Sequence, residues 1–218
     1  MYSRFFPKPA LAYTLVCALA GALISDTIYA YPLFGPRLSS QLGYTKLEAN
    51  VVAAAGNVGL FLSEPLLGAL TDQYGPRYSA LSGALLLFCS FAGLAALYVG
   101  QLFTTSFVMA VSLLLLLGIG TAAVQEAAFT SVARNFPPSV RGTMLGLLYM
   151  FFSLSGLFYS GISARWFASS QSEDRTYDFL RVLALITGFG TLAATTGLKW
   201  HSWAADEDVD VTKATGTA

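Results

Sequence analysis

Long runs of apolar residues, separated by short polar segments, dominate the chain. A helix needs about 20 mostly apolar residues to cross the hydrocarbon core of a bilayer. Within each run the apolar residues are continuous and do not alternate with polar ones, as they would in a membrane-spanning strand. The pattern therefore predicts an all-α integral membrane protein, a bundle of six transmembrane helices at residues 10–34, 49–70, 78–99, 106–133, 141–165 and 179–198.

The two ends of the chain differ in character. The first apolar run is too long for a secretory signal peptide and lacks a clear cleavage site, so we expect it to be retained as the first helix. Residues 204–218 are polar and acidic with no apolar periodicity, which predicts a disordered tail. We therefore expect one transmembrane domain over residues 1–203, followed by this tail.

Composition and charge exclude several classes of function. Hydrophobic residues make up 55% of the chain and charged residues 11%, whereas soluble domains carry about 25% charged residues. The formal net charge is zero, so the basic excess that nucleic-acid binding requires is missing. The sequence has one histidine and no G-x-S-x-G, P-loop or H-E-x-x-H motif, so we expect neither an enzyme nor a metal or other cofactor.

A ten-residue motif, GALTDQYGPR at 68–77, lies between the second and third apolar runs. It matches the pattern G-x-L-x-D-x-x-G-x-R at every specified position, and a chance match at a given start is about one in a million at ordinary residue usage. On this motif the chain resembles the major facilitator superfamily, whose signature loop joins the second and third helices. The resemblance implies a facilitator half with this loop in the cytoplasm, where it latches the two halves together.

Each residue type in this motif suits a gating loop. Gly68 allows neighbouring helices to approach closely. Asp72 can accept hydrogen bonds from the N-terminus of a facing helix or pair with an arginine. Gly75 permits the positive φ of a short turn, and we expect Pro76 to stop the helix and aim Arg77 at the headgroups. We assign Gly68, Asp72, Gly75 and Arg77 to the gate.

A second resemblance narrows the group. Residues 135–148 (NFPPSVRGTMLGLL) with 153–156 (SLSG), and residues 39–59, resemble nodulin-like facilitators and their fungal monocarboxylate-permease-like relatives. The sequence departs from that group at Tyr149, where such proteins often carry lysine. The resemblance includes the connection between the fourth and fifth helices, so we expect a second cytoplasmic loop with Arg134, Arg141 and Gly142.

Several polar side chains lie inside the predicted spans. A charge near the bilayer centre costs at least about 2.5 kcal/mol, so each is a functional candidate. We expect Asp26 and Glu126 to line a central cavity, where one of them could take up a proton coupled to a solute. Asn57 and Gln125 are further candidates for solute contact, and Glu64 lies closer to the gating loop. The alternative for each carboxylate is a packing role, in which it pairs with a backbone donor or another helix.

Facilitators usually have two six-helix halves with the solute site between them. The resemblance therefore implies secondary transport of a small organic solute, with a monocarboxylate as candidate, in a plasma or vacuolar membrane. The expected partners are the lipid bilayer, the solute and a second six-helix half, which is either a copy of this chain or another protein. The alternative is a non-transporting membrane partner or sensor derived from a truncated facilitator.

Overall fold

The computed structural model describes residues 9–101, 107–166 and 175–200. The first three elements share one apolar span, so these ranges contain six candidate membrane spans and confirm the all-α, six-helix prediction. The elements are α1 (Pro9–Ser25), the 3₁₀ turn η1 (Ile28–Ala30), α2 (Tyr31–Gln41), α3 (Lys46–Tyr74), α4 (Pro76–Tyr98), α5 (Phe107–Asn135), α6 (Pro138–Trp166) and α7 (Thr176–Ala194).

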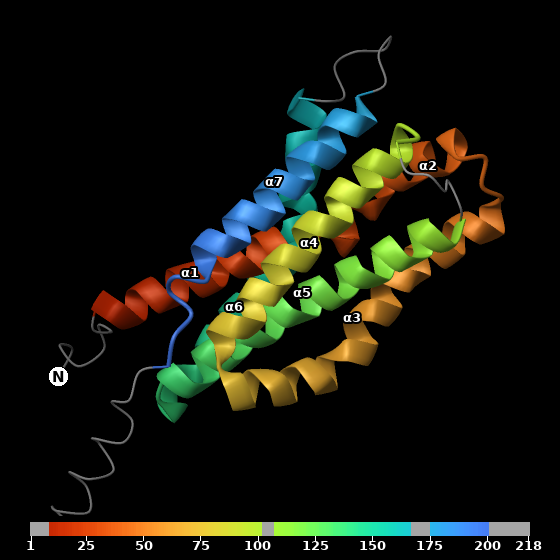
Figure 1. The fold of residues 1–218 in the computed structure, drawn as a ribbon. Helices are drawn as coiled ribbons and strands as arrows, with labels where there is room; N and C mark the ends of the chain where they lie inside the picture. Colours follow the sequence, from red (N-terminus) through yellow and green to blue (C-terminus); the bar gives the residue numbers. More distant parts are fainter. Residues whose placement is uncertain (1–8, 102–106, 167–174, 201–218) are drawn as a thin grey trace, which may run out of the picture.

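Helix α5 runs through the middle of the bundle and contacts α1, α3, α4 and α6 (Figure 1). Helices α1 and α4 also pack against α7, and α1 packs against α6. The spans alternate in direction, so α1 begins where α3, α5 and α7 end. We call this end of the bundle, which holds Gly75, Asn135 and Lys199, the latch end.

Glycines bring α3 and α5 into backbone contact. A Cβ atom on Gly118 of α5 would collide with the carbonyl oxygen of Gly56, and one on Gly59 of α3 would collide with the carbonyl oxygen of Leu115. Small residues favour such close crossings in membranes, where helix association depends on van der Waals packing. This contact fixes how α3 presents its polar side chains to α5.

The first span is broken, whereas the sequence predicted one continuous helix over residues 10–34. Helix α1 ends at Ser25, and the chain resumes as η1 and then α2, which continues to Gln41 through part of the predicted 35–48 connection. Pro32 explains the restart, because it has no N–H to donate and its ring would clash with the carbonyl group four residues earlier. It occupies the first turn of α2, where that donor is not needed.

Helix α3 begins three residues earlier than predicted because a capping box forms at its start. The backbone N–H of Thr45 donates to Glu48 Oε2 at 2.8 Å, and the Glu48 N–H donates to Thr45 Oγ1 at 3.3 Å. The helix changes direction in its second half (Figure 1), and Pro65 lies inside it. A proline inside a helix removes a backbone hydrogen bond, which accounts for the bend.

The connection between α3 and α4 is one residue long. The predicted 71–77 loop is helical up to Tyr74, and Gly75 turns the chain with φ +96°. Glycine adopts this φ without strain, as predicted. Helix α3 ends just before Pro76, as expected, and Pro76 is itself the first residue of α4, a position that needs no N–H donor.

The connection between α5 and α6 is equally short. Only Phe136 and Pro137 separate the two helices, so the predicted 134–140 loop is mostly helical. Arg134 lies in the last turn of α5, whereas Arg141 and Gly142 lie near the start of α6 and not in a loop. No described helix crosses α6 closely at Gly142 or Gly146, since a Cβ atom on either would meet nothing within 4 Å.

Helix α7 ends at Ala194, before the predicted end at residue 198. The next residues form turns in which the N–H of Gly197 donates to the carbonyl oxygen of Ala194 at 3.2 Å. This tighter pattern replaces the α-helical one and lets the chain leave the helix axis. The predicted acidic tail at 204–218 lies outside the described residues.

The close crossing of α3 and α5 predicts that alanine destabilises the protein at one glycine and not at another. Gly118→Ala should lower the free energy of unfolding by about 3 kcal/mol, the upper end of the usual overpacking cost, because the colliding atoms are backbone. The matched control is Gly146→Ala on α6, which has open space and should be neutral or slightly stabilising. Thermal unfolding in detergent micelles compares them, and equal melting temperatures for the two variants would contradict the crossing.

Candidate functional site

Hydroxyl groups from two other helices hold the break in the first span. A helix that ends inside a bilayer leaves carbonyl oxygens without partners, and each such group costs several kcal/mol in lipid. Here three consecutive carbonyl oxygens each accept a side-chain hydrogen bond. The pairs are Tyr159 to Ile24 (2.5 Å), Thr121 to Ser25 (3.0 Å) and Ser155 to Asp26 (2.7 Å).

The side chain of Asp26 is buried at this break. Its exposed fraction is 7%, and its Oδ1 has no hydrogen-bond partner among the described residues. The neighbouring hydroxyls of Ser25 and Thr27 are also buried and unpartnered in the described part of the chain. A buried polar group without a partner is costly and needs a water, ion or proton to satisfy it. The break therefore presents an acid that is positioned by its backbone while its carboxyl group remains available.

A second group of carboxylates lies between α3 and α5. Glu64, Gly68 and Asp72 are four residues apart on α3 and share one face. The carboxylate of Glu126 faces that stripe, since a Cβ atom on Gly68 would lie 3.5 Å from Glu126 Oε2. Glu64 and Asp72 are its charged neighbours. Among the described residues no three His, Cys, Asp or Glu side chains gather closely enough to hold a metal ion, and the carboxylates of this group carry like charges that repel one another.

Asp72 forms an ion pair with the last turn of α5. Arg134 Nη2 donates to Asp72 Oδ1 at 2.7 Å, which is the arginine partner foreseen for this aspartate. The side chains of Arg134 and Asp72 are 47% and 60% exposed, so water weakens the pair and it can open. We call this pair the latch. Arg77 is the second residue of α4 and is exposed.

The remaining candidates lie apart from both groups. Asn57 is exposed although it shares a helix face with the half-buried Glu64. Gln125 is half-buried beside Glu126. Arg141 Nε donates to the carbonyl oxygen of Phe136 at 3.1 Å, which fixes the α5–α6 turn. The structure thus divides the predicted site into an Asp26 group at the break and a Glu126 group toward the latch end.

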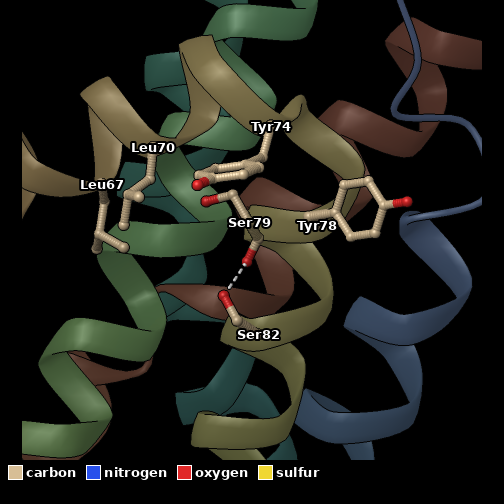
Figure 2. A pocket seen from close by; sticks show the side chains of 6 residues that line it. All are labelled: Leu67, Leu70, Tyr74, Tyr78, Ser79 and Ser82. Atoms are coloured by element: carbon tan, nitrogen blue, oxygen red, sulfur yellow. Dashed lines mark hydrogen bonds between the residues drawn. The ribbon is translucent and has the colours of Figure 1, made fainter.

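An open groove of about 280 Å³ lies beside the α3–α4 connection (Figure 2). Its lining is almost entirely apolar, and Figure 2 shows the Tyr78 ring pointing away from the two leucines. Its two serine hydroxyls are already used, because Ser82 donates to the Ser79 carbonyl oxygen at 2.8 Å and Ser79 to that of Ala123 at 2.9 Å. The groove is therefore suited mainly to apolar contacts. Its lining residues are Leu67, Leu70, Tyr74, Tyr78, Ser79 and Ser82.

Sequence reasoning missed the three hydroxyl residues that support the break, Thr121, Ser155 and Tyr159. A single hydroxyl in an apolar helix is common, and the pattern does not say which backbone group it meets. The break itself could have been predicted from the sequence, because the polar triplet Ser25–Thr27 precedes Pro32 inside one apolar run. That combination of weak helix formers and proline indicates a helix boundary.

The Major Facilitator Superfamily profile matches residues 14–208. Among curated proteins, the chain is 30% identical over 179 residues to "Probable transporter mch1" of Aspergillus fumigatus, covering 77% of this chain and 29% of that protein. It is 29% identical over 208 residues to "Probable transporter MCH1" of Gibberella zeae, covering 86% of this chain and 35% of that protein. The chain thus spans about a third of the length of these relatives.

Solved structures of facilitators share the fold. A proton:xylose symporter, XylE bound to 6-bromo-6-deoxy-D-glucose, superposes with a TM-score of 0.72 at 16% identity, covering 88% of this chain and 45% of that chain. An inward-open XylE from E. coli superposes with a TM-score of 0.61 at 17% identity, covering 96% of this chain and 52% of that chain. With a family profile over most of its length and the fold of one six-helix half, the chain is a multi-pass membrane protein that belongs to the Major Facilitator Superfamily.

Proposed function

We propose that the chain forms one half of a secondary active transporter that moves a small organic solute by alternating access. The observation that carries the proposal is the buried carboxyl group of Asp26 at the break in the first span, whose Oδ1 has no hydrogen-bond partner in the described part of the chain. An ionisable group in a membrane span is costly unless it serves a function or has a partner. The family is one of transporters and not of enzymes, so we assign this group to coupling.

Proton uptake at Asp26 gives the coupling step a physical basis. An ionised Asp26 carboxylate would be buried with no hydrogen-bond donor to its Oδ1 among the described residues. A proton removes that charge without any movement of the backbone, because the carbonyl oxygens of the break are already satisfied by hydroxyls. The protein can then change conformation without carrying a bare charge across the low-dielectric interior.

We extend the proposal to a monocarboxylate solute, which these charges would admit only together with a proton. The Asp26 and Glu126 groups together hold four carboxylates, and the arginine among them, Arg134, is already paired with Asp72. An anion approaching these groups meets like charge until a proton neutralises one of them. Anion and proton would therefore enter together, which is electroneutral symport. Asn57 and Gln125 remain candidate solute contacts in this proposal.

Glu126 connects the coupling step to the gate. It faces Gly68 on the stripe that also carries Glu64 and the latch residue Asp72. Protonation of Glu126 removes one of the like charges beside Asp72 and so changes how tightly the latch closes. In this scheme Glu64, Gly68, Asp72, Gly75 and Arg77 act in gating on the cytoplasmic side.

A second six-helix half would complete the transport path. Helices α3 and α6 are the least buried of the six spans, and α6 carries glycines with open space around them. The matched XylE chains are about twice as long as the matched region. We propose that another half covers these two helices, in a plasma or vacuolar membrane.

A non-transporting membrane partner is the second candidate, and the open faces of α3 and α6 favour it. Liposome reconstitution separates the two. If the chain is a transporter half, [¹⁴C]lactate uptake should appear when it is co-reconstituted with the second half of the Aspergillus fumigatus relative. If binding of that second half is detected by co-purification but no flux of any small acid follows, the partner function is favoured.

The coupling proposal predicts that both carboxylates are needed for uptake driven by an acidic outside. Asp26→Asn and Glu126→Gln should each lower [¹⁴C]lactate uptake at least about tenfold, which corresponds to about 1.4 kcal/mol in the rate-limiting barrier. The control is Asp178→Asn at the exposed start of α7, which should transport normally. Normal uptake in Glu126→Gln would remove Glu126 from coupling, and normal uptake in Asp26→Asn would remove the main support for the proposal.

The latch predicts that variants of the Asp72–Arg134 ion pair slow transport without lowering the stability of the fold. An exposed ion pair contributes about 1 kcal/mol or less, so Asp72→Arg and Arg134→Asp should barely change the melting temperature. Each single variant should slow transport because the gate no longer closes, and the double swap Asp72→Arg with Arg134→Asp should restore part of the rate. A double swap as slow as the single variants would show that the pair itself is not the gate.

A further inference from the structure

The chain that follows α7 returns along the latch end, where hydrogen bonds fix it to α1 and α5. The carbonyl oxygen of Lys199 accepts a hydrogen bond from Asn135 Nδ2 at 2.6 Å. Leu198 is fully buried in an apolar cluster with residues of α1, α5 and α6. The hydroxyls of Thr196 and Tyr13 share a hydrogen bond of 2.6 Å. We call residues 195–200 the strap.

The last described residue of the strap reaches the latch. The guanidinium carbon of Arg134 lies 4.4 Å from the centroid of the Trp200 ring, while Nη2 of the same group donates to Asp72 at 2.7 Å. Arginine stacks well on aromatic faces while its planar fork bonds a carboxylate. Arg134 is thus held between an aromatic ring from the strap and a carboxylate from α3.

We propose that Trp200 is a positioning residue for the latch: by covering one face of the Arg134 guanidinium, it holds that group against Asp72. The proposal rests on the gating role given above to Asp72 and Arg134. An exposed arginine has many rotamers, and the ring restricts them to those that reach the carboxylate. The latch therefore closes fully only while the strap is docked.

Docking of the strap and closure of the latch are therefore coupled. Undocking of the strap would pull Trp200 off Arg134 and weaken the ion pair with Asp72. In the opposite direction, opening of the latch would remove the Arg134 contact from the strap. The geometry therefore links the conformation of the gate between α3 and α5 to the docking of residues 195–200.

Two separate anchors make this role distinguishable from general packing. Leu198 and the Lys199 carbonyl group fasten the strap without using the Trp200 ring. Removing the ring should therefore leave the strap docked and the fold intact, while Arg134 loses its position. Trp200→Leu removes the aromatic face and keeps apolar bulk, and Trp200→Phe restores an aromatic face.

Fluorescence tests the contact without relying on transport. In a Trp166→Phe/Trp203→Phe background, Trp200 is the remaining tryptophan. Arg134→Gln should raise the acrylamide quenching constant of Trp200 about twofold, because the guanidinium no longer covers the ring. The control is Arg141→Gln, whose side chain bonds the Phe136 carbonyl group at the same end of the bundle and should leave quenching unchanged. Equal quenching in the Arg134→Gln and parent proteins would refute the contact.

Transport rates then test the positioning role. Trp200→Leu should slow [¹⁴C]lactate uptake as much as Asp72→Asn, Trp200→Phe should recover most of the rate, and Trp200→Leu with Asp72→Asn should be no slower than either alone. Additive losses would show that Trp200 acts independently of the latch and would overturn the inference. If Asp72→Asn has no effect on uptake while quenching still responds to Arg134→Gln, the gating role fails and the contact survives.

Discussion

The structure depends on how a broken helix satisfies its backbone inside a membrane. Lipid offers no hydrogen bonds, so a span that stops at Ser25 and restarts after Thr27 must find its partners within the protein. Side-chain hydroxyls of α5 and α6 supply them to three consecutive carbonyl oxygens. These contacts fix α1 to the centre of the bundle, and they hold the backbone at Asp26 while leaving its carboxyl oxygen Oδ1 unpartnered among the described residues.

A chain of contacts leads from the centre of α5 to the latch end. Thr121 supports the break, Glu126 faces the carboxylate stripe of α3, and Arg134 pairs with Asp72. All three residues lie on α5, which contacts more of the other spans than any other described helix. A rigid α5 therefore places the proposed proton site, the like-charged group and the gate in fixed order along one axis.

The sequence predicted the six spans and the Gly75 turn because both follow from local rules: the length of apolar runs and the φ that only glycine adopts easily. It also anticipated an arginine partner for Asp72, but could not name Arg134, because that contact joins residues 62 positions apart. The sequence did not predict the break in the first span, because the mean hydropathy of the apolar run stays high despite the polar residues Ser25–Thr27 and Pro32 within it. Residues on other helices that bond to the break, such as Tyr159, can be identified only once the packing of the helices is known.

Infrared difference spectroscopy on the reconstituted protein tests the central claim most directly, because it observes the proton on the carboxyl group itself. The account predicts a carboxylic-acid C=O band that changes when lactate is added and that disappears in Asp26→Asn while remaining in Asp178→Asn. A lactate-induced spectrum in Asp26→Asn identical to that of the parent protein would show that Asp26 does not carry the proton, and would contradict the role given to the break in the first span.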